Sequence, residues 1–259
     1  MAEKRRKKNT RRTAETWNRF KMFGPSVNFA VAEAYKLLRT NIMFSFSDED
    51  QCHVIGVTSS VRGEGKSTTA CNIAYVLSET GKKVLLIDAD LRRPSIAEKL
   101  GLQWGAGMTN LLVSRRDYKD VLQRCAMAPK LDILVSGDIP PNPSELLGSK
   151  RMTRLMEELS QDYDYIIVDL PPVTVVTDAL AISGLLHGVV MVVRDRVVQR
   201  RELAEAMRQL KLVNVRILGF VYRDSAESNR KYGSRYGKKR DEYYADYTSR
   251  PRIKVKNND

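Results

Sequence analysis

The sequence has few of the residues that build metal centres or disulfide frameworks. Among 259 residues, three are cysteine and two are histidine. Cys52, Cys71 and Cys125 show no C-x-x-C spacing, and His53 and His187 lie far apart in the chain. This set argues against a zinc site and against a fold held together by disulfides. We therefore expect reduced cysteines with structural roles, and no metal held by Cys or His.

Long apolar runs are also missing. No stretch approaches the roughly 18 to 20 apolar residues that cross a bilayer. The basic start of the chain is not followed by the apolar core of a signal peptide, so we expect a cytoplasmic protein. The hydrophobic content of 42% is enough for a substantial core. The length suits one α/β domain with tails.

Charge is abundant and mostly of one sign. The net charge is +13, and seven of the first twelve residues are Lys or Arg. Basic segments of this kind attract nucleic acid, acidic lipid headgroups or acidic proteins. A solvated segment that binds nothing specific is the alternative, and the composition leaves both open.

Short apolar runs alternate with helical patterns along the middle of the chain. The expected strands are 53–58, 83–88, 131–136, 165–170, 188–193 and 215–221, and the expected helices are 28–40, 66–80, 144–161 and 199–213. Continuous apolar strands separated by helices predict an α/β fold with a mostly parallel sheet covered on both faces. Ligands of such sheets bind at the carboxyl ends of the strands.

A phosphate-binding loop follows the first expected strand. Residues 60–67 match G-x-x-x-x-G-K-[ST], except that Ser60 replaces the first glycine. The backbone N–H groups of such a loop and the start of the next helix bind phosphates, and the hydroxyl after the lysine ligates Mg²⁺. A chance Gly-rich turn is disfavoured by the strand and helix on either side. We predict that ATP is bound by Ser60, Gly63, Glu64, Gly65, Lys66, Ser67 and Thr68.

Two later strands end in carboxylates. Asp88 and Asp90 close one strand and Asp169 closes another. In a parallel sheet all three gather near the phosphate loop, where an aspartate holds Mg²⁺ or accepts a proton from an attacking hydroxyl. A single such Asp is also compatible with a helix N-cap. We predict Lys66, Asp88, Asp90 and Asp169 as catalytic residues.

These motifs resemble those of a known family. The segments SSVRGEGKST, LLIDADLRRP and DYIIVDLPP resemble the Walker A, A′ and B motifs of bacterial tyrosine kinases, the cytoplasmic autokinases of capsule and exopolysaccharide synthesis of the CpsD and CapB type. The resemblance covers about residues 30–250 and implies a MinD/ParA-like P-loop fold. It also implies that Asp88 serves the incoming tyrosine hydroxyl as base or metal partner, that Asp90 supports it, and that Ser67, Asp88 and Asp169 hold the metal.

The resemblance assigns further positions, with two departures. The helix motif E-x-x-R-x-x-R, which packs between subunits of a ring in this family, reads Glu33, Lys36 and Arg39 here. Lysine cannot form the bidentate fork of the arginine that it replaces, and a helix that only covers the core is the alternative. Arg223 stands where the family has an asparagine that reads adenine. We predict that Arg223 also binds the nucleotide, either stacked on the base or placed elsewhere. Arg92 and Arg93 follow the A′ motif and either contact phosphate or a neighbouring subunit or are ordinary surface charge.

The end of the chain is rich in tyrosine. Tyr232, Tyr236, Tyr243, Tyr244 and Tyr247 are five of the eleven tyrosines in the chain. Together with the resemblance, this cluster predicts autophosphorylation in trans, in which a tyrosine of one subunit enters the site of another. A nucleic-acid-binding tail, in which Tyr stacks on bases between Lys and Arg, is the alternative, and we expect no nucleic-acid partner.

The resemblance also implies partners and a place in the cell. They are a membrane-embedded activator or polysaccharide co-polymerase that recruits the kinase to the inner face of the membrane, further copies of the chain in a ring, a cognate tyrosine phosphatase, and sugar-metabolising protein substrates. We predict a flexible basic segment at 1–25, the P-loop kinase domain at 26–223 and a flexible tyrosine-rich tail at 224–259.

Two other functions fit parts of the sequence. The first is a MinD/ParA-type ATPase switch on membrane or DNA, which matches the basic ends of the chain. The signature lysine of that branch is absent, because Val61 stands at its position. The second is a non-catalytic adaptor that binds nucleotide. The intact Lys66, Asp88 and Asp169 argue against it.

Overall fold

The computed structural model describes residues 27, 29–48, 51–114, 116–125 and 128–223. The segments predicted to be flexible, 1–25 and 224–259, lie outside these ranges, and the domain limits therefore remain predictions. Within the described ranges no helix combines the length and the apolar character needed to cross a membrane.

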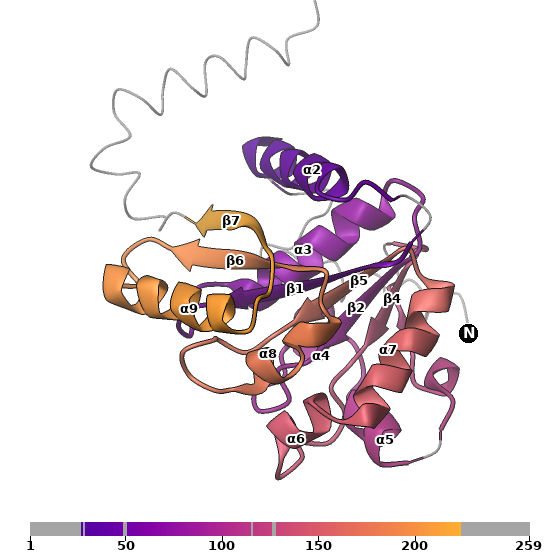
Figure 1. Cartoon of the computed structure of the whole chain (residues 1–259). Helices are drawn as coiled ribbons and strands as arrows, with labels where there is room; N and C mark the ends of the chain where they lie inside the picture. The colour runs from indigo at the N-terminus through magenta and orange to yellow at the C-terminus, as the bar shows by residue number, and fades with distance from the viewer. Residues whose placement is uncertain (1–26, 28, 49–50, 115, 126–127, 224–259) are drawn as a thin grey trace, which may run out of the picture. The chain divides into compact units, whose positions relative to one another are not determined.

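A seven-stranded sheet forms the centre of the described region (Figure 1). Its order is β3-β4-β2-β5-β1-β6-β7, and every neighbouring pair is parallel except β3 and β4. The strands are β1 (His53–Ser59), β2 (Val84–Asp88), β3 (Gln123–Arg124), β4 (Leu131–Leu134), β5 (Tyr165–Asp169), β6 (Gly188–Arg194) and β7 (Ile217–Arg223). The predicted mostly parallel sheet is confirmed.

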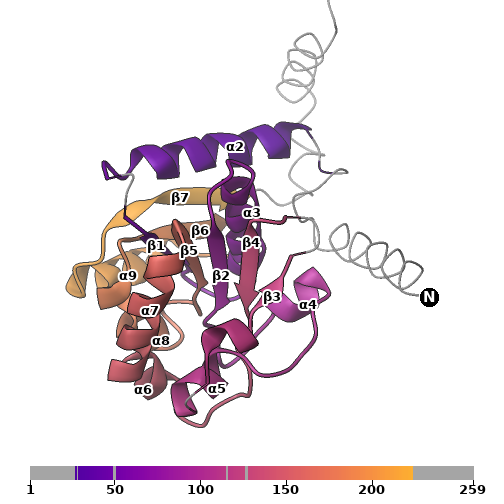
Figure 2. The same cartoon turned by 90° about the vertical axis from the view of Figure 1, so that its right-hand side faces the viewer.

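Helices cover both faces of this sheet (Figures 1 and 2). On one face lie α2 (Phe29–Phe44), α3 (Lys66–Ser78) and α4 (Ile96–Leu100), and α2 packs on α3. On the other face lie α5 (Met108–Val113), α6 (Pro143–Leu147), α7 (Lys150–Asp162), α8 (Asp178–Ala181) and α9 (Arg200–Leu212). Two 3₁₀ turns, η1 (Tyr118–Asp120) and η2 (Ser183–Leu185), complete the described elements.

The two-sided cover explains why the central strands contain runs of consecutive apolar residues. In β5, Ile166 and Val168 belong to the core beneath α5–α9, whereas Ile167 belongs to the core beneath α2–α4. Successive side chains of a strand point to opposite faces. A strand buried on both faces therefore needs hydrophobic residues without alternation.

One predicted helix is wrong. The pattern over 144–161 predicts a single helix, but α6 ends at Leu147 and α7 begins at Lys150. Ser149 adopts an extended backbone between them, and its hydroxyl accepts a hydrogen bond from the Met152 amide at 3.2 Å. A serine that caps the first turn in this way starts a new helix.

Candidate functional site

The phosphate loop joins the buried strand β1 to helix α3. Gly63 and Gly65 have φ angles of 84° and 94°, in the left-handed region that favours glycine. Gly65 is the N-cap of α3 and has no side chain to cap the first-turn N–H groups. Those groups and the positive end of the helix dipole are therefore available to an anion such as a phosphate. Ser67 and Thr68 lie buried in this first turn.

The loop is held from beneath by polar contacts. Ser60 is buried, and its carbonyl accepts a hydrogen bond from the Thr174 hydroxyl at 2.6 Å. Glu64 is also buried, and its two carboxylate oxygens accept from the amides of Val61 at 2.8 Å and Arg194 at 3.3 Å. Burial raises the pKa of Glu64, although these hydrogen bonds oppose the rise. Glu64 thus braces the loop backbone.

Two arginines at neighbouring strand ends also contact the loop. Arg194 of β6 and Arg223 of β7 are register partners. The Arg194 guanidinium donates to the Gly63 carbonyl at 3.1 Å, and the Arg223 guanidinium donates to the Gly65 carbonyl at 3.2 Å. A Cβ at Gly65 would lie 1.6 Å from Nη1 of Arg223, so a larger residue would displace this guanidinium in addition to straining the backbone. Arg223 therefore lies against the predicted nucleotide site.

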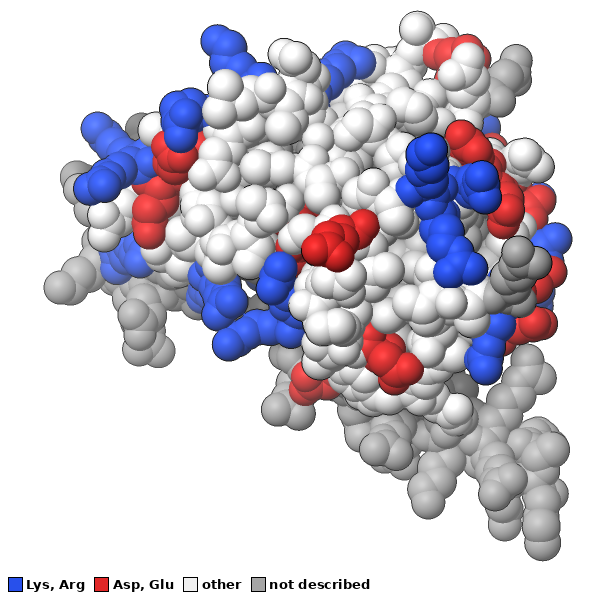
Figure 3. Space-filling view, turned by 60° about the horizontal axis from the view of Figure 1, so that its bottom comes forward, with Lys and Arg blue, Asp and Glu red and all other residues white. Residues whose placement is uncertain are grey.

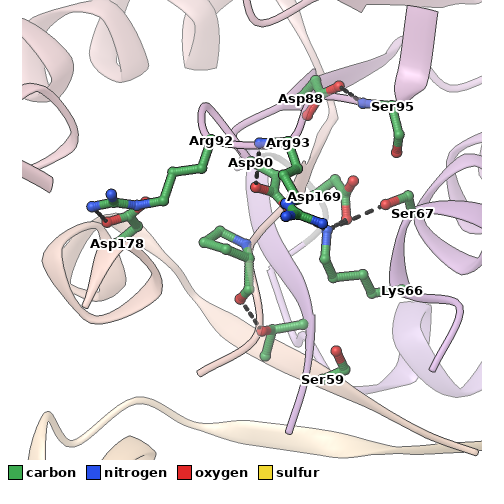
Figure 4. A network of polar contacts seen from close by, with 12 residues as sticks. Ser59, Lys66, Ser67, Asp88, Asp90, Arg92, Arg93, Ser95, Asp169 and Asp178 are labelled. Carbon is green, nitrogen blue, oxygen red and sulfur yellow. Dashed lines mark hydrogen bonds and ion pairs between the residues drawn. The ribbon is translucent and has the colours of Figure 1, made fainter. Parts of the chain in front are cut away.

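Lys66 lies in a buried cluster of carboxylates (Figure 4). Its Nζ is 2.8 Å from Asp90 Oδ2 and 3.3 Å from Asp169 Oδ1, and it donates to the Ser67 hydroxyl at 3.3 Å. Asp88 and Asp169 are register partners on the adjacent strands β2 and β5. The structure thus brings together the four residues that the sequence predicts as catalytic.

Two carboxylate oxygens in this cluster suit a metal ion. Asp88 Oδ2 accepts from the amides of Ser95 and Ile96, both at 2.9 Å. Asp88 Oδ1 and Asp169 Oδ2 are buried and have no hydrogen-bond partner in the described part of the chain. Mg²⁺ prefers oxygen ligands and is commonly held by one or two carboxylates together with substrate phosphates.

A metal at this place would depend on more than protein carboxylates. The described ranges contain no group of three or more His, Cys, Asp or Glu arranged to hold a metal ion. Ser67, next to Lys66 in the same helical turn, offers a hydroxyl oxygen. The residues present therefore fit a Mg²⁺ ion, for which the Ser67 hydroxyl and phosphate oxygens would supply further ligands.

The pKa values of the cluster reflect burial and mutual charge. Burial, followed by repulsion from Asp169, raises the pKa of Asp88 to about 7. Burial also raises the pKa of Asp169, although Lys66 opposes the rise. For Lys66 burial favours the neutral form, but attraction to Asp169 and Asp90 outweighs it and the pKa is raised. Lys66 therefore stays charged, and the protonated form of Asp88 is favoured relative to an exposed aspartate.

The structure adds a residue that sequence reasoning missed. Asp178, at the start of α8, is buried, and Arg92 donates to its two oxygens from Nε at 2.8 Å and from Nη2 at 3.0 Å. The Ser144 hydroxyl donates to the same carboxylate. Figure 4 shows Arg92 directed away from Lys66 toward Asp178. No motif marks Asp178, whereas Arg194 could have been noticed at the end of a predicted strand.

The helix predicted as an oligomer interface is α2. Lys36 and Glu33 form an exposed ion pair with an N–O distance of 2.8 Å, and Arg39 donates to the Val76 carbonyl of α3 at 3.1 Å. All three residues therefore have contacts within their own chain. Their role in an oligomer stays a prediction, and the tail tyrosines lie outside the described residues.

Charged side chains are dispersed on the face seen in Figure 3. On that face Lys and Arg form separate groups, with Asp and Glu among them. Among its described residues, this face shows no continuous basic stripe of the kind that marks a nucleic-acid-binding surface.

Comparison with known proteins identifies relatives of this chain. The family model described as "AAA domain" matches residues 52–213. Tyrosine-protein kinase YwqD of Bacillus subtilis (strain 168) is 38% identical over 208 residues, which is 80% of this chain and 87% of that protein. Putative tyrosine-protein kinase EpsB of Ralstonia nicotianae is 36% identical over 85% of this chain but only 29% of its own length. EpsB is therefore much longer than the region it shares.

Solved structures agree with these relatives. The kinase domain of Escherichia coli tyrosine kinase ETK superposes with a TM-score of 0.69 at 30% identity, covering 74% of this chain and 74% of that one. The crystal structure of the chimerical protein CapA2B2 superposes with a TM-score of 0.69 at 35% identity, covering 74% of this chain and 83% of that one.

Proposed function

The chain belongs to the bacterial tyrosine-protein kinases and is a protein-tyrosine kinase, and from this we propose that it uses ATP and Mg²⁺ to phosphorylate the tyrosines of its own C-terminal segment in trans. The observation that carries the proposal is the buried cluster beside the phosphate loop. In it Lys66 pairs with Asp90 and Asp169, and Asp88 lies beside Asp169 on the adjacent strand. Within the described residues Asp88 and Asp169 each have a buried oxygen without a hydrogen-bond partner, which suits a metal.

Each residue of the cluster has a role in this reaction. The loop amides and Lys66 bind and neutralise the phosphates, and Ser67, Asp88 and Asp169 would hold Mg²⁺, which neutralises further charge when bound. Asp88 or Asp90 accepts the proton of the tyrosine hydroxyl as that oxygen takes the phosphoryl group and the bond to ADP breaks. Phosphoryl transfer needs positioning and charge stabilisation more than covalent catalysis.

The proposal extends to assembly and regulation. Glu33, Lys36 and Arg39 on α2 support a ring of subunits, in which a tail tyrosine of one copy reaches the site of another. Each phosphorylation adds about −1.5 to −2 charges, so repulsion among modified tails would open the ring. A membrane-embedded activator would dock on the basic N-terminal region and recruit the kinase to the inner face of the membrane. A cognate phosphatase would reverse the modification.

The expected outcome for the cell is regulation of capsule or exopolysaccharide synthesis, as the family resemblance implies. Sugar-metabolising proteins are further candidate substrates. Two results would each contradict one part of the proposed assembly and regulation. An activator peptide that still stimulates a chain lacking residues 1–25 contradicts the docking region, and an unchanged oligomeric mass after full phosphorylation contradicts ring opening.

The decisive experiment measures autophosphorylation. Protein stripped of phosphate is incubated with labelled ATP, Mg²⁺ and an activator peptide, beside Lys66→Met and a variant with the five tail tyrosines changed to Phe. We expect label on tail tyrosines that is lost in both variants. ATP hydrolysis without labelled tyrosine would instead indicate a switch ATPase, and nucleotide binding alone would indicate an adaptor.

A further inference from the structure

A small cleft opens beside the phosphate loop. It encloses about 200 Å³ and has Lys66 and Asp90 among its lining residues. Its other lining side chains are of two kinds, cationic ones such as Arg62 and Arg93 and apolar ones from the segment after β5. A cavity of about 150 Å³ accepts benzene, so this space is large enough for one aromatic side chain.

The arginine side chains of the cleft differ in their ion pairs and hydrogen bonds. Arg92 is held by Asp178. Arg62 and Arg93 are exposed, and within the part of the chain that the structure describes neither guanidinium has an ion pair or hydrogen bond; the contact of Arg93 with Asp90 comes from its backbone amide. Two exposed cations that contact no other described side chain through an ion pair or hydrogen bond are thus placed at the cleft beside Lys66.

The apolar side chains of the cleft offer packing for a ring. Pro171 and Pro172 are buried, and Val175 is exposed at 42%. Aromatic rings pack well on such surfaces while keeping a polar tip in a polar place. The cleft therefore combines an apolar contact for a phenol ring, the carboxylate of Asp90, and positive charge for groups on either side of that ring.

The tail tyrosines fall into two classes by charge. Every charged residue within two positions of Tyr232 or Tyr236 is Lys or Arg, because these tyrosines are flanked by Arg230, Lys231, Arg235 and Lys238. Every charged residue within two positions of Tyr243, Tyr244 or Tyr247 is acidic, because these are flanked by Asp241, Glu242 and Asp246. Only the second class complements Arg62 and Arg93.

We propose that Arg62 and Arg93 select the acceptor, so that Tyr243, Tyr244 and Tyr247 of a second copy are phosphorylated before Tyr232 and Tyr236. This inference rests on the proposed autokinase function and names its preferred substrate, a tyrosine flanked by carboxylates. Opposite charges select a partner and like charges reject it. With two cations facing one or two carboxylates, a preference of about tenfold is expected at low salt, and it shrinks as salt screens exposed charges.

The test follows each tyrosine separately in the full chain. Phosphate-free protein receives ATP, Mg²⁺ and the activator peptide for a limited time, and site-resolved mass spectrometry reports the initial rate of labelling at each tail position. We expect the three tyrosines with acidic neighbours to be labelled about tenfold faster than the two with basic neighbours. Raising the salt concentration should reduce this ratio.

Two charge-neutralising variants identify the cause. Asp241→Asn with Glu242→Gln and Asp246→Asn leaves the catalytic site untouched and should bring the ratio toward one. The double variant Arg62→Gln with Arg93→Gln removes the positive charges of the cleft and should also bring the ratio of labelling rates toward one. The matched control is Arg154→Gln with Arg201→Gln, two exposed arginines on α7 and α9 outside the cleft, and it should keep the wild-type ratio.

The outcomes separate this inference from the proposed function. Equal initial labelling of all five tyrosines, or a preference that persists in both charge variants, overturns acceptor selection while leaving the autokinase intact. A change in the KM for ATP without a change in the labelling ratio would assign Arg62 and Arg93 to the nucleotide and would also overturn it. Absence of label on every tyrosine refutes the proposed function itself.

Discussion

The phosphate site and the surface of α2 each contain a lysine–carboxylate pair with the same separation. The N–O distance is 2.8 Å for Lys66–Asp90 and for Lys36–Glu33, but the side chains are 12% and 9% exposed in the first pair and 46% and 41% in the second. Water screens the exposed pair and leaves it weak, whereas removal of one buried partner leaves an uncompensated charge. Burial, not distance, decides the importance of each pair.

A third pair lies between these extremes. Arg92 and Asp178 are also 2.8 Å apart, with the arginine 40% exposed and the aspartate fully buried. If burial sets the effect, substitutions in the three regions should follow the order phosphate site, Arg92, α2. Substitutions of Lys66, Asp88, Arg92 and Lys36 test that order, from the largest expected effect to the smallest.

The largest effect is expected at Lys66. Lys66→Met removes the cation that would face the phosphates and leaves Asp90 and Asp169 without their partner. We expect autophosphorylation to fall by about 10³-fold or more, since loss of one preorganised charge at such a site has effects of this size. Initial rates of phosphotyrosine formation measure it. A variant that keeps a tenth of the wild-type rate would place the catalytic charge elsewhere.

The next effect concerns Asp88 and pH. Its pKa is raised in the folded protein from 3.8 to about 7, so folding favours the protonated form. The resulting stabilisation is fully present below about pH 4 and is lost as pH rises through 7. In protein free of nucleotide and Mg²⁺, the free energy of unfolding should therefore fall by about 3 to 4 kcal/mol across this range relative to Asp88→Asn.

Denaturant unfolding at several pH values measures this difference. Asp120→Asn, at an exposed position in η1, serves as the control and should keep the wild-type pH dependence. Parallel pH profiles for wild type and Asp88→Asn would contradict the raised pKa.

An intermediate effect is expected for Arg92, with its neighbour as the matched comparison. Arg92→Ala leaves the buried Asp178 without its cation, whereas Arg93→Ala removes a side chain without such a partner in the described residues. We expect Arg92→Ala to lower the free energy of unfolding by about 2 kcal/mol, because water reaches part of the pair. Arg93→Ala should change it by less than about 0.5 kcal/mol. Equal losses for both would remove burial as the explanation.

The smallest effect on stability is expected on α2. Lys36→Ala breaks an exposed pair between residues three positions apart, so the free energy of unfolding should change by less than about 0.5 kcal/mol. The same variant also probes the proposed ring, because an interface residue alters subunit association without destabilising its own fold. Light scattering measures the oligomeric mass, and an unchanged mass would argue against Lys36 as an interface residue.

Much of the site follows from local sequence rules. The glycines, lysine and serine of residues 60–67 predicted the phosphate loop because that pattern between a strand and a helix presents backbone N–H groups to phosphate. The carboxylates were predictable because parallel strands end at one edge of the sheet. Asp178 was not predictable, since its partner Arg92 is far away in the sequence and no local pattern links them.

The sequence by itself determined the fold class, the phosphate loop and the gathering of Asp88, Asp90 and Asp169, because period, glycine placement and strand ends are local properties of the chain. Only the tertiary structure decided the break between α6 and α7 and the hydrogen bonds from Glu64, Arg194 and Arg223 to the phosphate loop. It also decided which arginines pair with a carboxylate among the described residues and which do not. Those outcomes depend on burial and on contacts between distant segments of the chain. The same pair of charges interacts weakly when water screens it and strongly when it is buried.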